Sequence, residues 1–120
     1  MSKGKPNAPR ESDIQRAIMD YLGARRFRVF RRNVGSRVDE YKGKRRFIRF
    51  SQPGASDLWG WSRDNGRHFE IEVKRPGART DPVREARQRA WLYNAKADGA
   101  VAFEADSVED CERQLKEFGF

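Results

Sequence analysis

Three charged residues in the middle of the chain have the types and spacing of a hydrolytic site. Asp57 stands directly before the apolar run Leu58–Trp61, and Glu72 and Lys74 lie two residues apart in a segment of alternating apolar and polar residues. Side chains two apart on a strand point to the same face. If residues 58–61 and 68–74 pair as a hairpin, Asp57 and Glu72 can approach one cation. Lys74 would then orient or deprotonate a water molecule, or neutralise charge on a phosphate.

The same pattern has a plainer interpretation. Polar residues alternate on any amphipathic strand, and a Glu-x-Lys pair can simply face solvent. Glu70 shares the predicted face of Glu72 without an assignable role. The composition of the chain helps to distinguish these interpretations, because it limits which metal ligands and catalytic groups are available.

The scarcity of soft metal ligands narrows that chemistry. The chain of 120 residues contains one Cys and one His. This excludes a disulfide framework and a zinc site, and it leaves too little histidine for a His-based nuclease. Any metal would have to be held by carboxylates, which favours Mg²⁺ or Mn²⁺ and no zinc. No apolar run is long enough for a membrane span or a signal peptide, so the expected location is the cytoplasm, with no membrane partner.

The charge of the chain indicates a polyanionic partner. The formal net charge is +8 and the pI is about 10.1, with net +12 over residues 1–90 and −4 over residues 91–120. Arginine dominates the cations and can grip a phosphate with two parallel hydrogen bonds. The predicted partner is therefore a nucleic acid. The basic residues expected to contact it are Arg25, Arg26, Arg28, Arg31, Arg32, Lys42, Lys44, Arg45, Arg46, Arg49 and Arg75.

The elements that must position these residues follow from periodicity and capping signals. The predicted strands are 27–34, 46–50, 58–61, 68–74 and 100–105, and the polar segment 35–43 reads as a turn or an extended loop. Helices are predicted from Glu11 to between residues 23 and 26, over 82–97 after the N-cap Asp81, and from Ser107 onward. The result is an α/β fold of order α-β-β-β-α-β-α, with a possible fourth strand before the second helix. Residues 1–10 form a flexible basic arm before a single domain spanning 11–120.

Taken together, these motifs resemble the PD-(D/E)XK nuclease superfamily and, more narrowly, the VRR-NUC (virus-type replication-repair nuclease) family. Ser56 stands where the superfamily signature has Pro. The resemblance covers roughly residues 11–105. The segments that carry it are Glu11 with Gln15, Asn33-Val34-Gly35, Gly54-Ala55-Ser56-Asp57-Leu58, Glu72-Val73-Lys74 and Gln88.

The resemblance implies a role for each matching position. Asp57 and Glu72 would bind the metal directly, and the backbone carbonyl of Val73 would be a third ligand. Lys74 would position the attacking water or stabilise the transition state. The remaining two come from helices: Glu11 would bind metal directly or through water, and Gln88 would reach the site from the second helix. Read from the helices alone, Glu11 could instead favour the helix dipole and Gln88 could be an exposed helix residue.

The resemblance also implies an activity and an assembly. It predicts an Mg²⁺- or Mn²⁺-dependent DNA endonuclease with a PD-(D/E)XK-like core, a mixed central sheet flanked by helices. Standalone members suggest a homodimer that acts on branched DNA such as four-way junctions, in the cytoplasm of a bacterial or phage-infected cell. Two alternatives stay open, a non-catalytic DNA-binding protein and an RNA-binding accessory protein on the same fold.

One aromatic pair has no place in that scheme. Trp59 and Trp61 alternate with Leu58 and Gly60 along a predicted strand. The simplest expectation is that both pack on the sheet. The alternatives are base stacking and a subunit interface.

Overall fold

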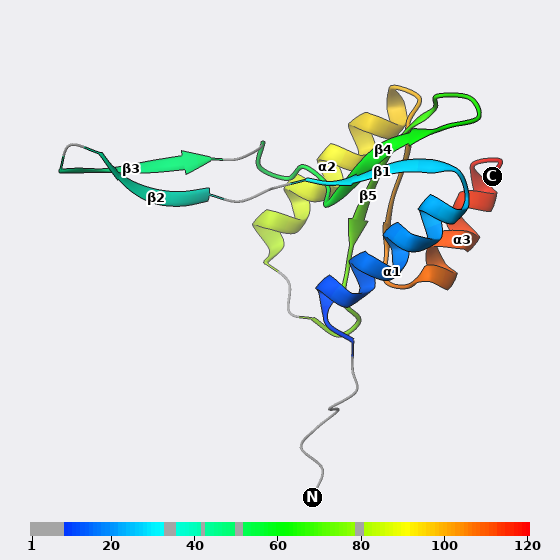
Figure 1. Cartoon of the computed structure of the whole chain (residues 1–120), viewed down its shortest axis with the longest axis horizontal. Helices are drawn as coiled ribbons and strands as arrows, with labels where there is room; N and C mark the ends of the chain where they lie inside the picture. The colour runs from blue at the N-terminus through cyan, green and yellow to red at the C-terminus, as the bar shows by residue number, and fades with distance from the viewer. Residues whose placement is uncertain (1–8, 33–35, 42, 50–51, 79–80) are drawn as a thin grey trace, which may run out of the picture.

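The chain folds into a mixed α/β structure, seen in a computed structural model that describes residues 9–32, 36–41, 43–49, 52–78 and 81–120 (Figure 1). The described elements follow one another as α1 (Glu11–Ala24), β1 (Phe27–Arg31), β2 (Ser36–Tyr41), β3 (Lys44–Arg49), β4 (Leu58–Ser62), β5 (His68–Val73), α2 (Pro82–Ala97), β6 (Val101–Ala105) and α3 (Val108–Glu117). None of these helices is both long and apolar enough to cross a membrane.

Four strands form the central sheet in the order β1-β4-β5-β6. β4 pairs antiparallel with both β1 and β5, whereas β5 and β6 are parallel and are joined through α2. This mixed sheet confirms the fold class predicted from the sequence. A parallel pair needs a crossover connection, and the helix of that crossover, α2, necessarily lies against the sheet.

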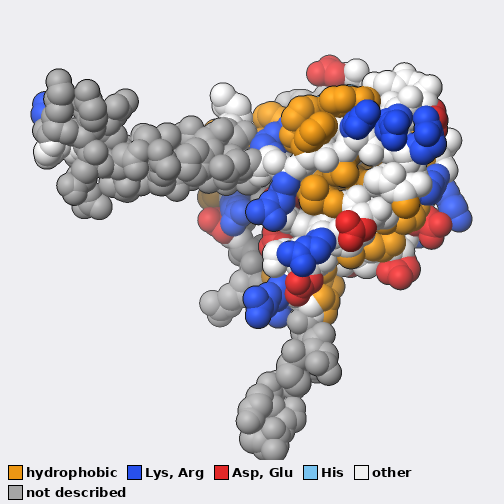
Figure 2. All heavy atoms as spheres, in the orientation of Figure 1, with side chains coloured by type: hydrophobic (Ala, Val, Ile, Leu, Met, Phe, Trp, Pro, Cys, Tyr) orange, Lys and Arg blue, Asp and Glu red, His pale blue; other side chains and the backbone are white. Residues whose placement is uncertain are grey.

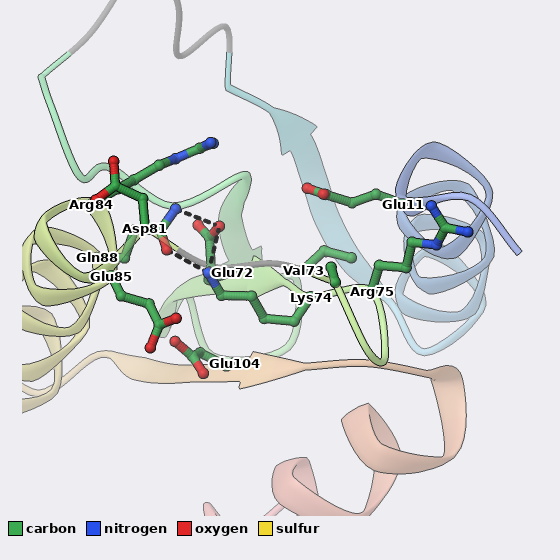
Figure 3. A pocket seen from close by; sticks show the side chains of 11 residues that line it. Glu11, Glu72, Val73, Lys74, Arg75, Asp81, Arg84, Glu85, Gln88 and Glu104 are labelled. Carbon is green, nitrogen blue, oxygen red and sulfur yellow. Dashed lines mark hydrogen bonds and ion pairs between the residues drawn. The ribbon is translucent and has the colours of Figure 1, made fainter.

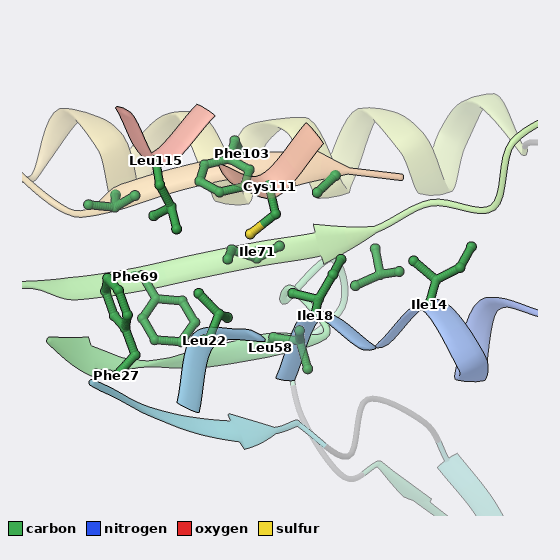
Figure 4. Close-up of a cluster of buried hydrophobic side chains, with 13 residues drawn as sticks. Ile14, Ile18, Leu22, Phe27, Leu58, Phe69, Ile71, Phe103, Cys111 and Leu115 are labelled. Atoms are coloured by element: carbon green, nitrogen blue, oxygen red, sulfur yellow. The ribbon is translucent and has the colours of Figure 1, made fainter. Parts of the chain in front are cut away.

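Alternation along β5 separates the two sides of the sheet. Phe69, Ile71 and Val73 point into the main hydrophobic cluster, where they meet Ile14, Ile18 and Leu22 of α1 and Cys111 and Leu115 of α3 (Figure 4). Glu70 and Glu72 point the other way, where side chains of α2 contact both of them. The sheet therefore has an apolar face under α1 and α3 and a polar face under α2.

The predicted helix caps and the hairpin are confirmed. Asp81 accepts a hydrogen bond from the backbone nitrogen of Val83 at the start of α2, with Pro82 as the first helical residue. Ser107 accepts one from the backbone nitrogen of Asp110 at the start of α3. The loop between β4 and β5 contains the Asn-Gly pair, and Gly66 has a positive φ of 74° there.

The predicted number of strands was wrong, because the polar segment 35–43 contains a strand. β2 pairs antiparallel with β3 as a separate two-stranded sheet, which extends away from the central sheet (Figure 1). The order is therefore α-β-β-β-β-β-α-β-α. A strand in a ribbon that extends from the core needs no alternating apolar face, so periodicity gave no signal. The predicted arm lies mostly outside the described residues, which begin at residue 9, and so does the end of the predicted 27–34 strand.

Candidate active site

A cleft of about 380 Å³ opens where the C-terminal end of β5 meets the first turns of α1 and α2 (Figure 3). Both acidic and basic side chains line it, which suits a site that holds a cation and an anionic substrate. It is lined by Glu11, Glu72, Val73, Lys74, Arg75, Ala78, Asp81, Arg84, Glu85, Gln88 and Glu104.

Three of the predicted site residues form one hydrogen-bonded chain in this cleft. The Gln88 side chain donates through Nε2 to Glu72 Oε2 at 3.0 Å and accepts a short bond from Lys74 Nζ through Oε1. Lys74 Nζ also lies 3.9 Å from Glu72 Oε2. The structure thus places Gln88 between Glu72 and Lys74, the two site residues predicted on the 68–74 strand. Gln88 is 5% exposed, so the structure excludes the alternative that it is an exposed helix residue.

Asp57 reaches the same end of the sheet from the turn before β4. Its residue is 7% exposed, and Oδ2 accepts a hydrogen bond from the backbone nitrogen of Val73 at 2.9 Å. That turn lies close to α2. A Cβ added to Gly54 would stand 2.7 Å from the Arg87 carbonyl oxygen, and φ is +88° there. Only glycine therefore permits this approach, which brings Asp57 beside β5.

Burial and a neighbouring carboxylate control the charge of Glu72. Burial, with the negative charge of Asp57 added, raises the pKa of Glu72 to about 8, although Lys74 acts in the opposite direction. Glu11 adds a smaller contribution of the same sign as Asp57. A bound cation would favour the ionised form of such a carboxyl group.

The residues present fit a hard divalent cation. Glu72 is 2% exposed, and its Oε1 atom is buried without a hydrogen-bond partner among the described residues. A buried carboxylate oxygen left unpaired is unfavourable unless a ligand completes it. Glu11 lies across the cleft at the start of α1 (Figure 3). Within the described ranges, no three His, Cys, Asp or Glu side chains lie close enough to hold an ion as they stand.

Sequence reasoning missed Glu104, which lies next to Glu72. The two are register partners on the parallel strands β5 and β6. Glu104 lines the cleft, and its Oε2 atom is also buried without a partner among the described residues. A signal was present, because Glu104 is the one acidic residue in the otherwise apolar segment 100–105. Its meaning depended on a strand pairing that the sequence does not specify.

A second buried polar cluster lies beside the cleft on the same face of the sheet and is built around Glu70. Glu70 accepts two hydrogen bonds from the Arg32 guanidinium at 2.7 and 3.2 Å, and others come from Ser56 and Trp91. His68 Nε2 lies 2.5 Å from Glu70 Oε2. Burial alone would raise the pKa of Glu70, but these hydrogen bonds outweigh it and lower the pKa to about 2. This cluster holds the turn that carries Asp57, because the Arg32 backbone nitrogen also donates to the Asp57 carbonyl at 2.7 Å.

Some of the residues predicted to contact DNA are exposed, whereas others already bind groups within the protein. Arg28 and Arg31 are exposed on β1, Lys44 is exposed at the start of β3, and Arg75 lines the cleft. Three others bind protein groups, namely Arg25 with Tyr21 and the Phe120 carbonyl, Arg26 with Asp64, and Arg32 with Glu70. Lys42 and the side chains of Arg45, Arg46 and Arg49 lie outside the described part of the chain.

The architecture has a counterpart among solved structures. A structure described as a VRR_NUC domain aligns with a TM-score of 0.56, at 19% sequence identity, over 90% of this chain and 96% of that chain. No family model and no curated protein sequence matches the chain. The chain therefore has the fold of this VRR_NUC domain structure, as the order of its motifs predicted.

Proposed function

We propose that the protein is a metal-dependent DNA endonuclease that hydrolyses phosphodiester bonds in the cleft between α1, β5 and α2. The observation that supports this best is the buried, unpartnered Glu72 oxygen beside the Lys74–Gln88 pair. On a nuclease fold, that arrangement provides a cation ligand and a positively charged donor within one cleft.

The residues that would hold Mg²⁺ or Mn²⁺ are Asp57, Glu72, the Val73 carbonyl and Glu11. When bound, the ion supplies positive charge that activates a water molecule and stabilises the negative charge developing on the phosphate. Carboxylate and carbonyl oxygens are the ligands that such ions prefer. Asp57 is kept in place by the Val73 backbone nitrogen, and Glu72 by the Gln88 amide.

Lys74 would act directly on the substrate. Its ammonium group is held at the cleft by Gln88, whose other amide atom fixes Glu72. From there it can donate a hydrogen bond to a phosphate oxygen or orient the attacking water. Gln88 is thus a positioning residue that sets the separation between Lys74 and Glu72. Arg75 and Arg84 line the same cleft and can bind neighbouring phosphates.

The finer features of the proposal come from the resemblance to VRR-NUC proteins. We propose a homodimer that prefers branched DNA such as four-way junctions. Each chain brings one copy of the cleft described above. A two-fold pair presents two clefts to the two strands that must be cut in a symmetric junction.

The proposal is tested by incubating supercoiled plasmid with the protein in Mg²⁺, in Mn²⁺ and in a chelator. Nicking is expected only with a divalent ion. Asp57→Ala and Lys74→Ala should each lower the rate by about 100-fold or more, the range for loss of an acid–base or electrostatic group. Lys116→Ala is the matched control, because this exposed lysine lies on α3, on the other side of the sheet.

The outcomes separate the parts of the proposal. Binding without cleavage in either ion would exclude the nuclease and favour a non-catalytic DNA-binding protein. Cleavage that survives Asp57→Ala would exclude the site. Equal rates on linear and four-way-junction DNA would exclude the junction preference, and a monomer in sedimentation at working concentration would exclude the homodimer.

A further inference from the structure

An exposed aromatic surface, distinct from the cleft, lies on the outer half of the polar sheet face. We call it the β1–β4 aromatic face, and it consists of Phe30, Trp59 and Trp61. Their ring centroids are 5.1 Å apart for Phe30 and Trp59, 5.5 Å for Phe30 and Trp61, and 6.2 Å for the two tryptophans. Phe30 and Trp61 are 41% and 38% exposed.

The topology explains why these rings are uncovered. Phe30 and Trp59 are register partners on β1 and β4, and Trp59 is the partner of Glu70 on β5, so all three side chains share the face that carries α2. α2 connects β5 to β6 and packs over those two strands. No described helix packs closely over the β1–β4 half of the same face, and Phe30 and Trp61 are exposed there. Both tryptophans pack on the sheet face as expected, but Trp61 stays 38% exposed there.

The charge around this face is positive. Arg28 is the register partner of Trp61, is exposed, and forms no ion pair with any residue that the structure describes. Figure 2 shows hydrophobic side chains gathered over β1 and β4, with Lys and Arg side chains beside them. The nearby acids are already engaged, since Glu70 is buried with Arg32 and Asp64 is paired with Arg26. A second copy of this face would bring like charges together, whereas a polyanion with flat apolar groups complements it.

A row of stacked groups links this surface to α2. The Arg32 guanidinium lies between two rings, 5.6 Å from the centroid of Trp59 and 5.4 Å from that of Trp91. Arg32 and Trp91 both bind Glu70, which stands two residues before Glu72 on the same face of β5. The aromatic face and the cleft are thus two parts of one sheet face, with the hydrogen-bonded Arg32, Glu70 and Trp91 between them.

We propose that the β1–β4 aromatic face binds unpaired DNA nucleotides, with bases stacked on Phe30 and Trp61 and a phosphate held by Arg28. Stacking on aromatic side chains needs bases whose faces are free, and these are present in single strands but not within a duplex. The proposal rests on the proposed function in taking DNA as the substrate. It adds that the substrate has an unpaired segment next to the bond that is cut.

The test measures binding without catalysis. A fluorescently labelled oligothymidylate of about 16 nucleotides, the upper end of common single-strand site sizes, is titrated with the whole protein in a chelator. Fluorescence anisotropy gives the affinity. Trp61→Ala and Phe30→Ala should each weaken binding by about 5- to 150-fold, the usual loss on removing one stacking ring. A blunt duplex of the same length should bind both variants as it binds the wild-type protein.

Two further variants distinguish the loss of base stacking from a general effect of the substitution on the fold. Tyr93→Ala removes an aromatic ring that is 73% exposed on α2, outside the aromatic face, and should leave single-strand affinity unchanged. Trp61→Phe keeps a flat ring and should retain most of the affinity that Trp61→Ala loses, which a merely misfolded variant would not do.

Other results would overturn the proposal. Unchanged single-strand affinity in both alanine variants excludes stacking. Equal losses for single strand and duplex show a general phosphate surface instead. Dissociation of a dimer in sedimentation by Trp61→Ala, with single-strand affinity kept, shows that the face binds a second copy. Because no cleavage is measured, these results stand whether or not the plasmid assay supports the nuclease.

Discussion

Replacing Arg32 by Ala is expected to destabilise the fold far more than replacing any exposed arginine. The guanidinium of Arg32 makes two hydrogen bonds to Glu70 and two to Ser56, and its side chain is 17% exposed against 5% for Glu70. In Arg32→Ala the Glu70 carboxylate would stay buried without its cationic partner. Removing one partner of a buried ion pair destabilises a protein by about 3 to 5 kcal/mol.

The pKa of Glu70 gives an independent magnitude. The pKa is lowered from 4.5 to about 2 on folding, and each pKa unit corresponds to about 1.4 kcal/mol. The ionised Glu70 therefore contributes roughly 3 kcal/mol, shared among Arg32, Ser56, Trp91 and His68. Arg32 makes the largest of the hydrogen-bond contributions that lower the pKa of Glu70, so its removal should account for much of this stabilisation.

The sign of the pH dependence follows from the lowered pKa. A carboxyl group with a lowered folded-state pKa stabilises the fold above its unfolded pKa, and this contribution disappears as the pH falls towards the folded value. The stability difference between wild type and Arg32→Ala should be complete above pH 4.5 and should shrink between pH 4.5 and about 2. Urea unfolding followed by circular dichroism, in a chelator at several pH values, measures it.

Arg26→Ala is the control at the other end of β1. Arg26 also pairs with a carboxylate, at 2.8 Å from Asp64, but the two side chains are 59% and 63% exposed. Such a pair contributes about 0 to 1 kcal/mol. Equal effects of the two substitutions, or a difference for Arg32→Ala that is constant with pH, would refute the reasoning.

Four further predictions concern backbone packing, thiol access and the candidate site. Gly60→Ala should lower the free energy of unfolding by about 3 kcal/mol or more, because its Cβ would stand 1.8 Å from the Arg28 carbonyl oxygen; thermal unfolding tests this. In the same assay Gly23→Ala, with open space around the new Cβ inside α1, should stabilise by about 0.5 to 1 kcal/mol. Cys111 should react with a disulfide reagent only through unfolding, because burial raises the pKa of its thiol to about 12. Rapid labelling of the native protein at neutral pH would contradict the packing of α3. Glu11→Gln should reduce plasmid nicking less than Glu72→Gln, because Glu11 is exposed and Glu72 is buried, and equal losses in the plasmid assay would contradict this ranking.

The parts of the fold that bury apolar surface were predictable from sequence. α1, β5 and α3 each place apolar residues at the period of their element, and Asp81 and Ser107 mark helix starts with their side chains. β2 was not predictable by the same reasoning, because a strand outside the core has no buried face to reveal it. The mixed sheet followed from the order of elements, since two strands joined by a helix are normally parallel.

The candidate site was predictable only where the pattern was local. Glu72 and Lys74 share a strand, so their common side followed from spacing alone. Gln88 required the resemblance to a known family, because nothing in its helix shows that it bridges the other two. Glu104 and the Arg32–Glu70 pair depend on contacts between segments distant in the chain, and a single sequence does not encode such pairings in a readable form.

The position of the β2–β3 ribbon has a consequence for how this protein can diversify. Arg31 and Leu58 are register partners on adjacent strands, so the chain leaves the central sheet and returns to it at neighbouring points. The segment between these two residues can therefore change in length at little cost in stability. Doubling the length of a loop adds only about 0.6 kcal/mol of closure entropy. Insertions, deletions or whole replacement domains can be accommodated there while Arg32 and Asp57, at its two ends, keep their contacts. Under the proposed function, changes in the β2–β3 ribbon would fit the same central sheet to different DNA shapes.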